Sequence, residues 1–155
     1  MVTLRLADAL PAEVVRALGD DPTRRRDRLW RERLHAYLDA GHGACCLRLP
    51  AVAAVMERSL LHFDGERYRL LAWSVMPSHV HAVLEAVTGF SLSRVLHSWK
   101  SYTAKEGNRL VGRTGRFWQP EYFDRYIRDG VHYANAVSYV EANMSEYSSA
   151  ARGRP

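Results

Sequence analysis

The segment from Val75 to Leu84 constrains the fold of this chain more than any other. It reads Val-Met-Pro-Ser-His-Val-His-Ala-Val-Leu, an apolar run that carries His79 and His81 two positions apart. Side chains in a β-strand alternate between faces, so the two imidazoles of such a strand point the same way. They then stand about 7 Å apart along the strand and can converge on one metal ion. The alternative is a pair of polar residues that face solvent, and the spacing alone leaves both interpretations open.

A second strand-like segment precedes this one. Residues 68–76 have the length and composition of a strand, and Pro77-Ser78 separates them from the histidine segment. We therefore predict an antiparallel hairpin. Helical patterns are interleaved with the strands, and no glycine-rich phosphate loop follows a strand. This order favours an α+β fold, a small antiparallel sheet with helices packed on it. The length of 155 residues indicates one domain, 1–155.

Helix boundary signals divide the rest of the chain. Asp21 followed by Pro22 predicts a helix start, and Gly41 predicts the end of that helix. Ser91 is the expected N-cap of a helix that runs to about Asn108. The other expected elements are a strand at residues 2–6, a helix from Pro50 to Asp64 and a last helix from about Val131 to Met144. The short apolar stretch 44–49 is left without an assignment.

Composition bounds the compartment and the partners. No run of 18 apolar residues is present, and the N-terminal residues lack the pattern of a signal peptide. The two cysteines are adjacent, Cys45 and Cys46, which suits neither a structural disulfide nor a four-ligand zinc site. We therefore expect a reduced, cytoplasmic protein without a membrane partner.

The basic residues are nearly all arginine. The net charge is +5, and 20 of the 22 basic residues are arginine. Arginine binds phosphate in a bidentate manner and stacks on bases, so this composition favours a nucleic-acid partner. The alternative is the codon bias of a GC-rich genome, which also enriches alanine and arginine.

Tyr139 and Asn143 are separated by four residues in the last predicted helix, so they share a helix face. If that face covers the His-x-His strand, Asn143 could donate its amide oxygen to a metal ion. Tyr139 would then stand one turn away as a nucleophile. Two imidazoles and an amide oxygen form an open site that suits Mg²⁺ or Mn²⁺ better than structural zinc. The alternative is a half-buried aromatic residue followed by a helix cap.

Two segments carry a resemblance to a known family. Residues Trp73–His81 and Phe117–Arg128 resemble the REP-associated tyrosine transposases, which are single-tyrosine HUH endonucleases related to the transposases of single-strand insertion sequences. The family pattern is Met-Pro-Asn-His-x-His, a Trp-Gln…Arg block, and a Tyr followed four residues later by Asn-Pro. This chain departs from it with Ser78 in place of Asn and Met144 in place of Pro, and only residues 144–155 follow Asn143.

The resemblance implies a fold and a chemistry. The fold would be a ferredoxin-like sheet with the histidines on a central strand and the tyrosine on a helix over the same face. His79, His81 and Asn143 would bind Mg²⁺ or Mn²⁺, which polarises a scissile phosphate. Tyr139 would attack that phosphate in single-stranded DNA and form a 5′-phosphotyrosine and a free 3′-hydroxyl. Rejoining by a DNA 3′-hydroxyl would complete DNA transposition without ATP.

The expected partner is single-stranded or hairpin DNA, bound by a monomer or a homodimer. The candidate DNA-binding residues are Lys100, on the helix expected after Ser91, and four arginines in or just before the aromatic block, Arg113, Arg116, Arg125 and Arg128. Two alternatives stay open. One is a module of the same fold that binds hairpin DNA but has lost catalysis, as a shortened C-terminal segment would allow. The other is an RNA-binding protein in which His-x-His is structural only.

Overall fold

The computed structural model describes residues 1–11, 14 and 28–143. Their elements, in chain order, are the strand β1 (Val2–Arg5), the helix α2 (Arg28–Asp39), the 3₁₀ turn η2 (Cys46–Arg48), the helix α3 (Pro50–Leu61), the strands β2 (Tyr68–Val75) and β3 (His79–Ala86), the helix α4 (Leu92–Val111), the short strand β4 (Phe123–Asp124) and the helix α5 (Gly130–Ala142).

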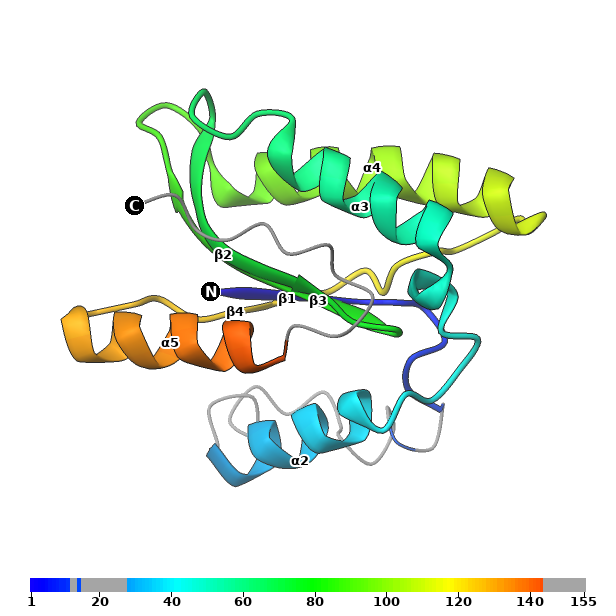
Figure 1. The fold of residues 1–155 in the computed structure, drawn as a ribbon, viewed down its shortest axis with the longest axis horizontal. Coiled ribbons are helices and arrows are strands. Elements are labelled where there is room, and N and C mark those ends of the chain that lie inside the picture. Colours follow the sequence, from blue (N-terminus) through cyan, green and yellow to red (C-terminus); the bar gives the residue numbers. More distant parts are fainter. Residues whose placement is uncertain (12–13, 15–27, 144–155) are drawn as a thin grey trace.

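The four strands form one antiparallel sheet in the order β2-β3-β1-β4. The predicted hairpin is confirmed, because β2 and β3 pair on either side of Pro77-Ser78. The histidine strand β3 lies inside the sheet, and Thr3 of β1 faces His81 in the register. Helices α3 and α4 cover one face of the sheet, while α2 and α5 lie on the opposite side (Figure 1). The α+β fold predicted from the sequence is therefore confirmed.

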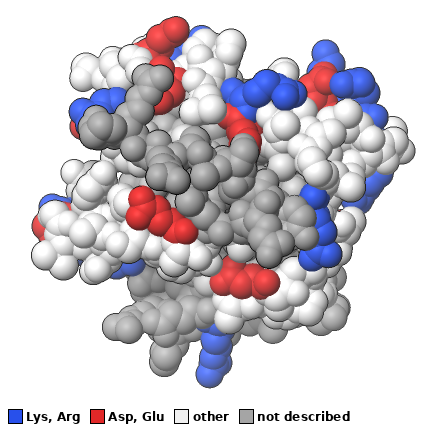
Figure 2. Space-filling view, viewed as in Figure 1, with Lys and Arg blue, Asp and Glu red and all other residues white. Residues whose placement is uncertain are grey.

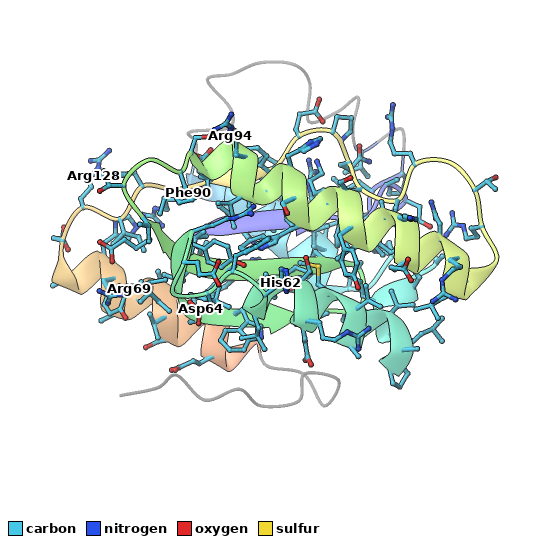
Figure 3. All side chains as sticks on the ribbon, turned by 90° about the horizontal axis from the view of Figure 1, so that it is seen from above. His62, Asp64, Arg69, Phe90, Arg94 and Arg128 are labelled. Atoms are coloured by element: carbon cyan, nitrogen blue, oxygen red, sulfur yellow. The ribbon has the colours of Figure 1, made fainter. Side chains whose placement is uncertain are left out.

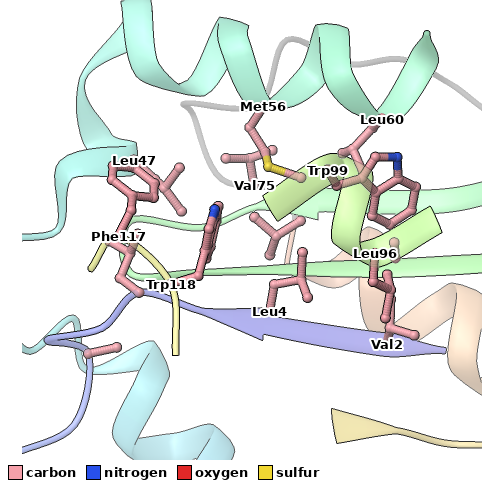
Figure 4. Packing of buried hydrophobic residues seen from close by; sticks show 14 of the residues in the cluster. Val2, Leu4, Leu47, Met56, Leu60, Val75, Leu96, Trp99, Phe117 and Trp118 are labelled. Carbon is pink, nitrogen blue, oxygen red and sulfur yellow. The ribbon is translucent and has the colours of Figure 1, made fainter. Parts of the chain in front are cut away.

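The main core lies between the sheet and the α3–α4 layer. Alternate residues of β1, including Leu4, contribute to it together with one stripe of each helix (Figure 4). Trp99 of α4 is 1% exposed, and its indole N–H donates a hydrogen bond to the hydroxyl of Tyr68 at 2.9 Å. Burial of these apolar side chains supplies most of the stabilisation of the fold. The opposite face has a smaller cluster, Ala72, Val83, Ala136 and Val140.

The aromatic block before β4 anchors the chain rather than projecting from it. Trp118 is buried, and its indole N–H donates to Thr103 Oγ1 at 2.8 Å. The side-chain amide of Gln119 donates to the carbonyl oxygen of Ala7 at 2.6 Å. The Trp-Gln pair of the sequence motif therefore ties residues that follow α4 to the end of β1.

Several local predictions can be compared with the described residues. Ser91 is the N-cap of α4, and its Oγ accepts a hydrogen bond from the Arg94 N–H, as predicted. Gly41 adopts φ +71° just after α2, as expected of a residue that ends a helix. The unassigned stretch 44–49 forms η2 and the N-cap of α3. The helix start predicted at Asp21-Pro22 and the helix end predicted at Met144 lie outside the described residues.

None of the helices in the described ranges combines the length and the apolar character that crossing a membrane requires.

Candidate functional site

The two histidines form the centre of the candidate site. His79 and His81 lie at the start of β3, and both side chains are 0% exposed. Because they are two residues apart in a strand, their rings project from the same face. That face is the one turned toward α2 and α5. The Nε2 atoms of the two rings lie 3.1 Å apart, so the pair converges as the sequence predicts.

The outer nitrogen of each ring is held by a hydroxyl group. His81 Nδ1 lies 2.9 Å from Thr3 Oγ1, and His79 Nδ1 lies 3.1 Å from Ser78 Oγ. The Ser78 hydroxyl has a single proton, which it donates to the carbonyl oxygen of Leu38 at 3.0 Å. Ser78 Oγ must therefore accept its second hydrogen bond from the Nδ1–H of His79. In the neutral ring this leaves Nε2 of His79 with its lone pair, the form that binds metal ions.

A carboxylate completes this cluster. Asp39 is the last residue of α2, and its Oδ1 lies 3.4 Å from His79 Nε2. One ligand atom from each of Asp39, His79 and His81 falls within 4.8 Å of the others. A carboxylate and a neutral imidazole nitrogen with a free lone pair are both acceptors, so a cation or a proton must lie between them. The donor set fits a divalent ion: imidazoles suit ions such as Zn²⁺, and the carboxylate suits Mg²⁺ or Mn²⁺.

Helix α5 brings Tyr139 to the histidines. The rings of Tyr139 and His81 have centroids 5.3 Å apart and meet edge to face. The Tyr139 hydroxyl lies 3.0 Å from Nδ1 of His35, a residue of α2. The His35 ring is in turn 5.3 Å from that of His81. Three elements far apart in the sequence thus place a phenol beside the imidazole pair.

The protonation of the site follows from its burial. Burial lowers the pKa of His81 well below 6.5, and the neighbouring His79 and His35 lower it further. His81 is therefore neutral at pH 7 and available as a ligand. Burial also raises the pKa of Tyr139 to about 12; the Asp39 carboxylate adds to this rise, and Asn143 opposes it. The phenol is accordingly protonated at neutral pH.

Asn143, the expected third ligand, caps the C-terminus of α5. Its amide nitrogen donates a hydrogen bond to the carbonyl oxygen of Tyr139 at 2.8 Å. The side chain therefore lies in the same turn as the tyrosine, and it opposes the rise in the pKa of the Tyr139 hydroxyl. Its place as a metal ligand stays a prediction.

The five basic residues expected at DNA divide into two groups. Lys100 donates to the carbonyl oxygens of Gln119 and Pro120 at 2.6 and 2.8 Å, and Arg113 forms an ion pair of 3.5 Å with Asp8. The remaining three, Arg116, Arg125 and Arg128, have exposed side chains. Basic and acidic groups are interspersed on the face shown in Figure 2. Seen from above, Arg128 lies at the same end of the molecule as Arg69 and Arg94 (Figure 3).

Two residues of the site were missed by the sequence analysis. His35 and Asp39 lie four residues apart on α2, so they occupy one helix face and reach the site together. The His-x-x-x-Asp spacing in the sequence could have indicated two polar side chains on one helix face. What the local pattern could not show is that α2 lies on the same side of the sheet as α5.

Comparison with known proteins agrees with this geometry. The family model described as "Transposase IS200 like" matches residues 59–143, more than half of the chain. The chain belongs to the IS200-like transposase family. The matched range includes the His-x-His strand and ends at Asn143, so the family resemblance read from the motifs is confirmed.

The fold has a solved counterpart in the structure of a REP-associated tyrosine transposase bound to a REP hairpin. The TM-score is 0.52 at 17% sequence identity, and the match covers 92% of this chain. The chain spans 63% of the length of that protein. At this identity the likeness establishes the fold alone. A comparison with curated proteins finds no match.

Proposed function

We propose that this chain cleaves and rejoins single-stranded DNA, with Tyr139 as the nucleophile and a divalent metal ion held by His79 and His81. The observation that carries the proposal is the approach of the Tyr139 ring to within 5.3 Å of the His81 ring. This contact joins the end of α5 to the start of β3 at the buried, neutral imidazole of His81. Membership of a transposase family supports the same chemistry.

In the proposed step, Tyr139 Oη bonds to the phosphorus atom and the bond from phosphorus to the 3′-oxygen breaks. The products are a 5′-phosphotyrosine and a 3′-hydroxyl, and attack by a DNA 3′-hydroxyl reverses the step. A bound ion would polarise the scissile phosphate, with Asn143 as the proposed further ligand. The proton of the phenol must leave as the new bond forms. His35 Nδ1, 3.0 Å from the hydroxyl, is placed to accept it and to orient the attacking oxygen.

The proposed DNA partner is a hairpin with a single-stranded segment. The solved counterpart is bound to a REP hairpin, and the exposed side chains of Arg116, Arg125 and Arg128 are available for phosphate contacts. Lys100 and Arg113 would act on DNA indirectly, because their present contacts hold the chain around Gln119 and Asp8.

The test is formation of a covalent adduct. The protein is incubated with hairpin DNA that carries a single-stranded flank, in the presence of Mn²⁺, and then denatured. We expect a protein–DNA adduct from the wild type and none from Tyr139→Phe. The control is Tyr102→Phe, which removes a hydroxyl from an exposed position on α4 and should leave the adduct unchanged. Tight binding of intact DNA without an adduct would instead identify a hairpin-binding module.

A further inference from the structure

We infer that Asp39 is a ligand of the divalent ion, so that the metal centre is built from β3 and from the C-terminal end of α2. This inference rests on the proposed function, because it concerns the ion that the two histidines would hold. It goes beyond the His-x-His motif, since it adds a carboxylate from a helix outside the range matched by the family model.

Acceptor atoms of three residues converge at the proposed centre. Asp39 Oδ1 lies 3.4 Å from His79 Nε2, and His79 Nε2 lies 3.1 Å from His81 Nε2. When the His79 ring is neutral, its hydrogen bond to the Ser78 hydroxyl places the proton on Nδ1 and leaves Nε2 with its lone pair. A carboxylate oxygen facing such a nitrogen is unfavourable unless a positive charge lies between them. A divalent ion supplies that charge and uses the lone pairs of all three residues.

The helix turn that carries Asp39 is held in place. Leu38, next to Asp39, is 1% exposed, and its carbonyl oxygen accepts the hydrogen bond of the Ser78 hydroxyl at 3.0 Å. One serine therefore contacts both the ring of His79 and the helix turn that carries Asp39. The same hydroxyl fixes the orientation of one ligand and the distance to another. Such preorganisation is what a specific metal site requires.

The carboxylate also gives the centre an anionic ligand on its exposed side. Asp39 keeps 37% of its side chain exposed, while both imidazoles are 0% exposed. The open side of the cluster is thus the side of the carboxylate, from which an ion could enter. An anionic oxygen ligand adds affinity for hard cations such as Mg²⁺ and Mn²⁺. It also offsets part of the positive charge that would otherwise be buried next to neutral rings.

The test measures Mn²⁺ binding directly, by titration calorimetry on the full chain without DNA. We expect Asp39→Asn to weaken Mn²⁺ binding by about tenfold or more. Asp39→Glu keeps the carboxylate and should retain more of the affinity than Asp39→Asn. The control is Asp124→Asn, which removes the same charge from an exposed position on β4 and should leave the affinity unchanged.

Thermal unfolding with and without Mn²⁺ provides a second readout, which distinguishes a metal ligand from a purely structural residue. Without metal, Asp39→Asn should melt at the same temperature as the wild type or higher, because one of two facing acceptors becomes an amide. With Mn²⁺, the rise in melting temperature should be smaller than in the wild type. A lower melting temperature without metal would show a structural ion pair between Asp39 and a protonated His79, and would overturn the inference.

The outcomes separate the two proposals. If His79→Ala abolishes Mn²⁺ binding while Asp39→Asn binds within about twofold of the wild type, Asp39 is not a ligand and the metal-dependent function stands. If the wild type itself does not bind Mn²⁺, the metal-dependent function fails, and the ligand role of Asp39 fails with it.

Discussion

Ser78 stands where the family pattern has asparagine, and its hydroxyl makes two contacts at once. It donates to the carbonyl oxygen of Leu38 and accepts from Nδ1 of His79. An asparagine side chain could also offer both a donor and an acceptor, which explains why the substitution is compatible with the site. The shorter serine side chain makes both of these hydrogen bonds with its single hydroxyl group.

This arrangement predicts the effect of Ser78→Ala. Loss of the hydroxyl leaves the buried carbonyl of Leu38 without this donor, so we expect the free energy of unfolding to fall by about 1–3 kcal/mol. The ring of His79 also loses the contact that orients it, and Mn²⁺ affinity should fall by about 10- to 100-fold. Chemical denaturation and titration calorimetry measure the two effects separately.

Ser74→Ala is the matched control. Ser74 is also 0% exposed and lies opposite His81 in the β2–β3 register, but within the described ranges its hydroxyl has no hydrogen-bond partner. Removing it should change stability by less than about 0.5 kcal/mol, or raise it. Equal losses in the two variants would contradict the role assigned to Ser78.

At the level of elements, local signals predicted several local features, although the turn η2 was left without an assignment. The β2–β3 hairpin, the Ser91 cap and the end of α2 near Gly41 each depend on a few neighbouring residues, and each was predicted. The pairing of β1 with β3 joins residues almost 80 positions apart, as in the contact between Thr3 and His81. No local pattern encodes such pairing. Asp39 was missed for the same reason, because its place in the site depends on where α2 packs against the sheet.

Helix α4 carries a glycine whose place is explained by packing. A Cβ atom at Gly107 would stand 2.6 Å from two ring atoms of Phe117, a residue that is 6% exposed. Gly107→Ala gains about 1 kcal/mol in helix propensity but forces this buried ring to move, which costs about 1–3 kcal/mol. We expect a net loss of about 1 kcal/mol in the free energy of unfolding, measured by urea denaturation.

The control for this prediction is Gly130→Ala at the start of α5. There a Cβ atom meets nothing within 4 Å, so the variant should be as stable as the wild type or slightly more stable. Stabilisation by Gly107→Ala would show that the Phe117 ring moves aside without cost.

On the scale of the whole molecule, the sheet separates the main hydrophobic core from the candidate functional site. The α3–α4 face buries the main core, and the opposite face combines a cluster of four buried apolar residues with the buried histidines. Variants in the main core should therefore affect unfolding before they affect the geometry of the site. The buried His81 of the site also makes the free energy of unfolding depend on pH.

The last prediction concerns the metal-free protein in acid. The pKa of His81 is well below 6.5 in the folded state because the ring is buried beside two other histidines, while the unfolded chain has the ordinary value. Well above pH 6.5 the ring is neutral in both states and contributes no pH dependence. As the pH falls below 6.5, the unfolded state takes up a proton that the folded state does not. The free energy of unfolding should therefore fall, by at most about 1.4 kcal/mol per pH unit for this one group.

Urea denaturation between pH 5 and 8 measures this slope. His81→Asn should flatten the profile below pH 6.5, because it removes the group that the folded state keeps neutral. His97→Asn, at an exposed position on α4, should leave the slope as in the wild type. Saturating Mn²⁺ should steepen the loss of stability, because protons then compete with the ion for the imidazole nitrogens. A protein that becomes more stable on acidification would show instead that the folded state binds the proton, and the buried pair would then be an imidazolium–imidazole pair rather than a site poised for metal.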